Sequence, residues 1–187
     1  MACKAKANRY TVGEYFMKRL IMVNGTMGAG KTAVCTELYH ILNRSVFLDG
    51  DWCWMMDPFV VTDETKRMVQ NNISFLLRNF LVCSEYENVI FCWVMQYESI
   101  MDDLLSRLSG LEFEPYKFTL MLSEQALTQR IQKDVQRHVR TSDVLERCLQ
   151  RLPLYEHMDT VKIDVSEITA RQAAEQIHDA LCKGCKG

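Results

Sequence analysis

The chain has little net charge, no long apolar run and no internal repeat. Its 187 residues carry 22 Lys and Arg against 24 Asp and Glu, so no overall basicity favours nucleic acid as a partner, although a local basic patch remains compatible with this balance. The apolar runs are too short to cross a bilayer, and none precedes Tyr15, so neither a membrane segment nor a secretory signal is expected. A hydrophobic content of 48% suits one compact domain with a sizeable core.

The eight cysteines do not form a disulfide or zinc pattern. Four of them stand in apolar stretches of the sequence, as reduced cysteines of a cytosolic core do: Cys35, Cys83, Cys92 and Cys148. The Cys182–Cys185 pair has C-x-x-C spacing, but a zinc site needs two more ligands and no second pair has ligand spacing. We expect this pair to lie in a frayed C-terminus.

Residues Gly25–Thr32 match the Walker A pattern G-x-x-x-x-G-K-[ST] at every fixed position. The apolar run before them is typical of a buried strand, and the residues after them of a helix. Glycines let backbone N–H groups turn toward a phosphate, and the helix start adds partial positive charge. Lys31 would reach the β- and γ-phosphates of a nucleoside triphosphate, and the Thr32 hydroxyl would hold Mg²⁺. The predicted nucleotide-binding residues are Gly25, Met27, Gly28, Ala29, Gly30, Lys31, Thr32 and Ala33.

Strand and helix patterns alternate along the chain, which predicts one α/β domain over residues 17–187. About five parallel strands are expected, at residues 20–23, 45–49, 89–94, 116–122 and 161–165. Together with the Walker A match, helices on both faces of the sheet and a short lid predict a P-loop NTPase fold. Residues 1–16 have weak periodicity and are expected to be an N-terminal appendage, with Met17 as an alternative start.

Three residues have the position and chemistry of helix N-caps: Thr62, Ser123 and Thr169. Thr169 also has capping-box spacing with Gln172. The long helix after Thr62 is expected to bury a set of apolar side chains, which are Met68, Ile73, Phe75, Leu76, Phe80 and Leu81.

Two acids, Asp49 and Asp51, flank Gly50 at the end of the second predicted strand. Ligands of a doubly wound sheet bind at the carboxyl ends of its strands, so these carboxylates are expected beside the Walker loop. There they could hold Mg²⁺ through water, or accept a proton from a substrate hydroxyl. The alternative is a polar turn, because Asp-Gly is a common turn pair.

The third predicted strand lacks the acid that a standard Walker B motif places at its end. It continues instead into Trp93, Val94, Met95 and Gln96. This absence argues against a motor-type or AAA-type ATPase. It favours small kinases, which draw their acid from the second strand.

A basic stretch at about residues 130–142 is expected to form the lid. It contains Arg130, Lys133, Arg137 and Arg140. Phosphoryl transfer needs cations over the equatorial oxygens, on an element that closes and excludes water. The alternative is a solvated helix face, which charged residues often adopt.

Aromatic side chains follow Asp51 and are candidates for the wall of an acceptor pocket: Trp52, Trp54, Phe59 and, from the third strand, Trp93. Such rings stack on a base or pack against an apolar acceptor. The alternative for each ring is core packing. Arg67 and Arg78 on the long helix could bind an anionic acceptor, although most arginines on a helix surface do not.

Together the Walker loop, the Asp49–Asp51 stretch and the lid-like run from Leu127 to Arg130 resemble the small P-loop kinases. These include shikimate kinase, gluconate kinase, adenylylsulfate kinase and chloramphenicol phosphotransferase. Residues 47–54 with 57–59 are also similar to a bacterial group of AAA-family ATPases or nucleotide kinases. The resemblance covers residues 18 to about 182.

The resemblance implies a role for each matching residue. Lys31 and Thr32 would bind phosphate and Mg²⁺, and Asp51 or Asp49 would be the base or a carboxylate on the metal side. Arg130 would lie against adenine. Arg137 or Arg140 would reach the γ-phosphate during transfer. The chain lacks the glycine cluster after the third strand of shikimate kinases and the His-Pro that follows the Gly-Asp pair in gluconate kinases.

The leading hypothesis is a cytoplasmic kinase, monomeric or homodimeric, that uses ATP and Mg²⁺. It would move the γ-phosphoryl group to a hydroxyl or phosphate of a small molecule such as a nucleoside or nucleotide, with Lys31, Asp51, Arg137 and Arg140 as catalytic residues. The acceptor would contact Asp51, Trp52, Trp54, Arg67 and Trp93. The alternative is a nucleotide-binding regulatory protein with slow ATP hydrolysis. A nucleic-acid 5′-hydroxyl kinase is a third hypothesis, against which the net negative charge counts.

Overall fold

A five-stranded, wholly parallel sheet forms the centre of the computed structural model, which describes residues 17–138, 141 and 143–184. Its spatial order is β2-β3-β1-β4-β5, so the strand that precedes the Walker loop lies in the middle. The strands are β1 (Arg19–Asn24), β2 (Ser45–Asp49), β3 (Asn88–Cys92), β4 (Glu114–Met121) and β5 (Val161–Asp164). The predicted α/β P-loop NTPase fold is therefore confirmed.

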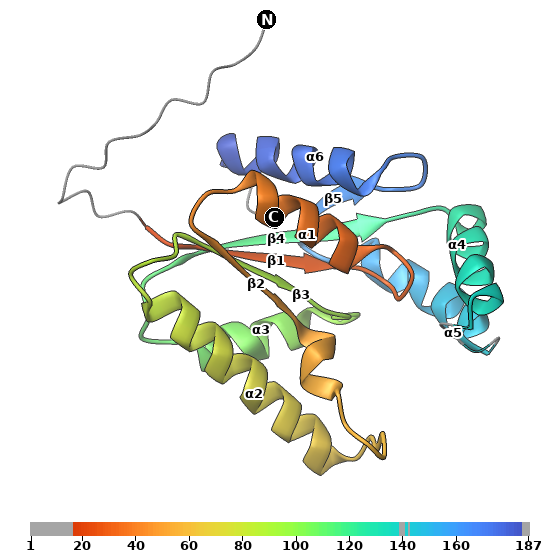
Figure 1. Cartoon of the computed structure of the whole chain (residues 1–187), viewed down its shortest axis with the longest axis horizontal. Coiled ribbons are helices and arrows are strands. Elements are labelled where there is room, and N and C mark those ends of the chain that lie inside the picture. The colour runs from red at the N-terminus through yellow and green to blue at the C-terminus, as the bar shows by residue number, and fades with distance from the viewer. Residues whose placement is uncertain (1–16, 139–140, 142, 185–187) are drawn as a thin grey trace, which may run out of the picture.

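Helices cover both faces of this sheet (Figure 1). On one face lie α1 (Lys31–Ile41) and α6 (Ala170–Cys182), and on the other α2 (Asp63–Val82) and α3 (Glu98–Arg107). Strand β1 serves both layers, because alternate side chains of a strand point to opposite faces. Ile21 and Val23 enter the core under α1 and α6, whereas Leu20 and Met22 enter the core under α2 and α3.

The remaining helices lie beyond the carboxyl end of β4 (Figure 1). They are α4 (Glu124–Gln136) and α5 (Val144–Arg151), followed by the 3₁₀ helix η2 (Leu152–Tyr155). A second 3₁₀ helix, η1 (Gly50–Trp54), follows β2 directly. No helix among the described residues is long and apolar enough to span a bilayer.

Side-chain caps start three helices where the sequence predicts them. The Thr62 hydroxyl accepts a hydrogen bond from the Thr65 N–H at the start of α2, and Ser123 does the same for the Ala126 N–H at α4. Thr169 and Gln172 form the expected capping box at α6. These local signals depend on residues within one turn of each other, which is why sequence alone reveals them.

Two expectations about buried positions and boundaries are wrong in detail. Strand β3 ends at Cys92 rather than at Val94. Helix α2 buries Val69, Ile73, Leu77 and Leu81, spaced four residues apart. Met68 and Phe75, which were expected inside, are 42% and 66% exposed. The face that a helix buries is set by the sheet it packs on. Ile73 and Leu81 of the expected set lie on that face, together with Val69 and Leu77, which the sequence reasoning did not select.

Candidate nucleotide-binding and phosphoryl-transfer site

The loop between β1 and α1 has the backbone of a phosphate-binding site. Gly25 and Gly30 have φ of 145° and 89°, which L-residues with a side chain rarely adopt. A Cβ on Gly25 would also lie 2.9 Å from the Leu120 carbonyl oxygen of β4. Gly30 is the N-cap of α1 and contributes no side-chain cap. The first N–H groups of α1 are therefore directed at whatever lies over the loop, which is favourable for an anion.

Lys31 is held over this loop and is almost fully buried, with 8% of its surface exposed. Its ammonium donates to the carbonyl oxygens of Gly25 and Thr26 at 3.0 and 3.1 Å. Burial lowers the pKa of this ammonium, while the nearby carboxylates of Asp51 and Asp49 act in the opposite direction. A phosphate anion would favour the charged form and replace the two carbonyl contacts.

Thr32, Asp49 and Asp51 form one hydrogen-bonded unit across the sheet edge. The Thr32 hydroxyl donates to Asp49 Oδ2 at 2.6 Å, and the Asp51 N–H donates to Asp49 Oδ1 at 3.0 Å. Asp49 is 4% exposed, so its carboxylate is fixed by these bonds at the start of η1. The structure therefore brings the strand-two acids to the Walker loop, as the sequence predicts.

The donors of this unit fit a magnesium ion bound together with a nucleotide. Mg²⁺ prefers hard oxygen ligands and usually keeps water and phosphate oxygens among them. Thr32 and Asp49 offer a hydroxyl and a carboxylate oxygen 2.6 Å apart beside the loop. No group of three or more His, Cys, Asp or Glu that could hold a metal by itself occurs in the described part of the chain. Phosphate and water would therefore supply the remaining ligands.

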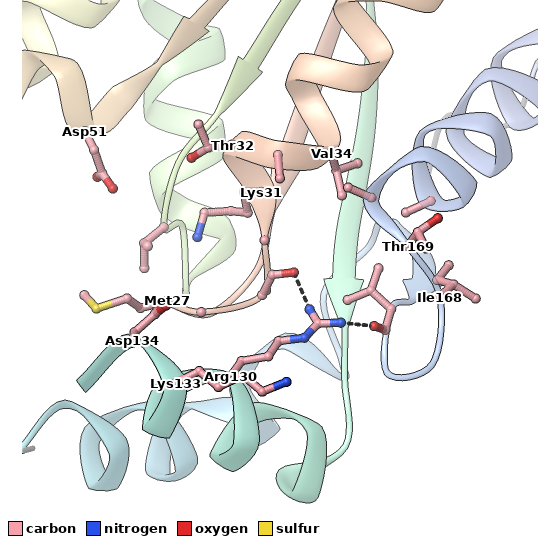
Figure 2. A pocket seen from close by; sticks show the side chains of 18 of the residues that line it. Met27, Lys31, Thr32, Val34, Asp51, Arg130, Lys133, Asp134, Ile168 and Thr169 are labelled. Atoms are coloured by element: carbon pink, nitrogen blue, oxygen red, sulfur yellow. Dashed lines mark hydrogen bonds between the residues drawn. The ribbon is translucent and has the colours of Figure 1, made fainter. Parts of the chain in front are cut away.

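A cavity of about 460 Å³ opens over the loop (Figure 2). The loop and the start of α1 form its floor, and Asp51 reaches it from η1. Helix α4 and the segment from the end of β5 into α6 form its other walls. Its lining residues are Met27–Val34, Asp51, Val94, Arg130, Lys133, Asp134, Arg137, Val165, Ile168, Thr169, Ala170 and Ala173.

Arg130 joins two walls of this cavity. Its guanidinium donates to the Ala29 carbonyl oxygen at 3.0 Å and also to the Val165 carbonyl oxygen (Figure 2). These contacts link residues that are 101 and 35 positions away in the sequence. The planar guanidinium thus closes the side of the cavity between α4 and β5.

The basic stretch begins on a helix rather than on a loop. Arg130 and Lys133 lie within α4, and Arg137 is its C-cap residue. Lys133 and Arg137 line the cavity together with Asp134, which the sequence reasoning did not select. Helix α4 carries them because it begins at the Ser123 cap and continues to Gln136. Arg140 and part of the predicted lid lie outside the described residues, as do residues 1–16 and Cys185.

The predicted acceptor-binding tryptophans do not line the cavity. Trp93 packs on Gly50, where an added Cβ would lie 2.6 Å from Trp93 Cγ. Trp52 contacts Phe47, with ring centroids 5.2 Å apart, and lines a separate groove beside α1 and β2. The Trp54 and Phe59 rings lie against each other, with centroids 5.9 Å apart. Their role toward an acceptor stays a prediction.

The two arginines of α2 differ in their surroundings. Arg67 is exposed near the start of the helix, and its binding of an acceptor also stays a prediction. Arg78 donates to the Arg107 and Ser109 carbonyl oxygens at 2.6 and 3.3 Å. Arg78 therefore fastens α2 to the end of α3.

The wall that sequence reasoning missed is the segment from Val165 to Ala173. The members of this segment that line the cavity are small or apolar and, apart from the Thr169 cap, have no motif-like signature: Val165, Ile168, Thr169, Ala170 and Ala173. They meet the Walker loop only because β5 lies next to β4, which lies next to β1. An apolar surface of this kind suits the face of a nucleotide base.

The sequence of residues 21–150 matches the model of the AAA domain family. The chain belongs to the AAA domain family. The sequence argument from the missing acid after β3 counted against an AAA-type ATPase, whereas the matching family carries the AAA name. In this structure Asp49, at the end of the neighbouring strand β2, supplies a carboxylate at the loop. No curated protein is detectably similar in sequence.

Several solved structures share the fold of this AAA domain. A gluconokinase from Sinorhizobium meliloti is 21% identical, with a TM-score of 0.59 over 91% of this chain and 99% of its own. A tunicamycin resistance protein from Deinococcus radiodurans is 20% identical, with a TM-score of 0.63 over 90% and 96%. A shikimate kinase from Acinetobacter baumannii is 19% identical, with a TM-score of 0.59 over 90% and 94%. The chain thus has the fold of the small P-loop kinases, as the sequence resemblance implies.

Proposed function

We propose that this AAA domain is an ATP-dependent phosphotransferase that moves the γ-phosphoryl group of ATP to a hydroxyl or phosphate of a small molecule. The observation that carries the proposal is the unit of Thr32, Asp49 and Asp51 beside Lys31. A P-loop that only binds nucleotide needs no second acid directed into the same cavity. The kinase names of two structural neighbours support the same activity.

Each residue of the site would have a separate role in phosphoryl transfer, whose catalysis consists mostly of positioning and charge stabilisation. The loop N–H groups and Lys31 would hold the β- and γ-phosphates. Thr32 and Asp49 would hold Mg²⁺, which neutralises charge on the phosphate oxygens when bound. Asp51 would accept the proton of the acceptor hydroxyl as its oxygen attacks phosphorus and ADP leaves. Arg137, Arg140 and Lys133 are candidates for the cation over the transferred group, and Arg130 for the contact with adenine.

The first experiment measures ADP release with Mg-ATP over a panel of nucleosides, nucleotides, sugar acids and antibiotics, with Lys31→Ala as the blank. One acceptor should raise the rate many-fold over water. Asp51→Asn should then lower turnover by about 100-fold or more, with ATP affinity within about threefold, because only general-base catalysis is removed. Asp102→Asn, an exposed acid on α3, is the matched control.

Full transfer activity in Asp51→Asn would remove Asp51 from the mechanism. If no acceptor raises the rate of ADP release and ATP still binds tightly, the alternative is favoured. That alternative is a regulatory protein with slow hydrolysis, in which Asp49 and Asp51 only shape the turn. We further propose a cytoplasmic enzyme that acts as a monomer or homodimer.

A further inference from the structure

A second, smaller pocket lies between the Walker loop and α5, and is here called the α5 pocket. It has a volume of about 30 Å³. Its lining residues are Thr26, Met27, Val94, Val144, Arg147, Cys148, Arg151 and Tyr155. Met27 and Val94 also line the cavity over the loop, so the two spaces adjoin. A buried water needs about 10–15 Å³ of such space. The α5 pocket therefore has room for one small polar group rather than for a whole ligand.

The α5 pocket contains a buried hydroxyl without a partner. Tyr155 is 1% exposed, and its hydroxyl has no hydrogen-bond partner among the described residues. Burial raises the pKa of this hydroxyl, while the positive charge of Arg151 acts in the opposite direction. The hydroxyl is therefore protonated at neutral pH and lies within the field of a guanidinium. Because buried polar groups are nearly always paired, this hydroxyl indicates a group that accepts a hydrogen bond from it.

The charge that borders the α5 pocket is positive. Arg147 and Arg151 are four positions apart on α5 and so lie on the same side of the helix. Arg147 donates to Asp143 at 2.8 Å, which compensates its charge. Arg151 forms no ion pair or side-chain hydrogen bond with another residue that the structure describes. None of the lining residues is acidic. An anionic group would therefore find a guanidinium and a hydroxyl donor in the same small space.

We propose that the acceptor carries a carboxylate or phosphate group that binds in the α5 pocket at Arg151 and Tyr155, and this inference rests on the proposed kinase function. From this group the acceptor extends past Met27 and Val94 into the cavity over the loop, where its hydroxyl lies at Asp51. The hydroxyl oxygen forms the new bond to the γ-phosphorus, and the bond from phosphorus to the β-phosphate oxygen breaks. ADP leaves, and the hydroxyl proton passes to Asp51.

Three probes with one carbon skeleton test this assignment: glycerate, glycerol 3-phosphate and neutral glycerol. Their binding to the full chain is measured by ligand-observed NMR. A non-hydrolysable ATP analogue and Mg²⁺ are present, so that the anions do not bind at the Walker loop. At least one anion should bind about tenfold or more tightly than glycerol, since hydrogen bonds to charged groups are stronger than neutral ones. The anion that binds more tightly distinguishes a carboxylate from a phosphate.

Single substitutions then separate the two binding groups. Tyr155→Phe removes only the hydroxyl and should weaken binding of the anion by about fivefold or more, with glycerol unaffected. Arg151→Gln should weaken it by about tenfold or more. Arg147→Gln should weaken it less, because Arg147 is already in an ion pair. The matched controls are Tyr39→Phe and Arg171→Gln, which should leave binding unchanged. Both residues are exposed, on α1 and α6, and line neither space.

Several results overturn the inference. Glycerol that binds as tightly as both anions, or no binding of either anion, would exclude an anion site. Anion binding that is unchanged in Tyr155→Phe and in Arg151→Gln would place the anion elsewhere, as would equal losses in the control variants. Arg151 is exposed, so Arg151→Gln still provides the test if Tyr155→Phe does not fold. A lower unfolding free energy of Tyr155→Phe with unchanged anion binding would assign the hydroxyl to a buried water.

ADP release separates this inference from the proposed kinase function. Transfer to neutral acceptors alone, at rates that Arg151→Gln does not change, overturns the inference and leaves the kinase function intact. Anion binding that depends on Tyr155 and Arg151, without ADP release from any acceptor, supports the α5 pocket and contradicts the kinase function.

Discussion

Gly50→Ala tests the close packing of Trp93 on Gly50, the residue between Asp49 and Asp51. An added Cβ would lie 2.6 Å from Trp93 Cγ, 2.7 Å from Cδ1 and 3.0 Å from Cβ, against 3.4 Å for the shortest ordinary contact. These atoms are at the rigid base of the indole side chain, so a simple rotation of a flexible end does not relieve the clash. Overpacking of this kind costs about 1–3 kcal/mol.

The effect of the same change on backbone entropy raises the unfolding free energy, whereas the overpacking lowers it. The φ of Gly50 is not positive, so alanine adopts the native backbone without strain. Replacing Gly by Ala at such a position stabilises a protein by about 0.4–1 kcal/mol through the unfolded chain. Subtracting this term leaves a net loss of about 0–2.6 kcal/mol in unfolding free energy, or roughly 0–10 °C in the unfolding midpoint for a domain of this size.

The assay is urea unfolding of four proteins: wild type, Gly50→Ala, Trp93→Ala and the double variant. Trp93→Ala removes the atoms that the new Cβ meets, so in that background Gly50→Ala should be neutral or stabilising by up to about 1 kcal/mol. This change of sign between the two backgrounds is the decisive result. An equal effect of Gly50→Ala on unfolding free energy in the two backgrounds would refute the steric argument.

The remaining predictions concern two buried polar side chains. Lys31 has its pKa lowered from 10.5 by burial, so between the lowered pKa and 10.5 the folded state binds fewer protons and unfolding free energy rises with pH. In Lys31→Met this rise should be absent when unfolding free energy is measured by urea at several pH values up to about 10. Equal slopes of unfolding free energy against pH in wild type and variant would contradict the prediction. The Tyr155 hydroxyl is buried, with no hydrogen-bond partner among the described residues. Tyr155→Phe should leave unfolding free energy unchanged or raise it by up to about 1 kcal/mol, whereas a loss above about 1 kcal/mol would reveal a partner.

The sequence by itself determined the nucleotide half of the site. The Walker loop, its strand and its helix lie in one continuous stretch, and the glycines and Lys31 act through backbone geometry within that stretch. The helix starts at Thr62, Ser123 and Thr169 are equally local. Asp49 and Asp51 were predictable because parallel strands of one sheet bring their carboxyl ends to the same edge.

Only the tertiary structure decided which distant residues close the cavity. Arg130 donates to Ala29 and Val165 across 101 and 35 positions, and no periodicity or motif contains that pairing. Trp93 lies on Gly50 because β3 pairs with β2, so a ring expected beside the acceptor packs against the turn between the two acids. The physical reason is common to both cases. Local chemistry fixes turns and caps, whereas strand order and side-chain packing determine which surfaces meet.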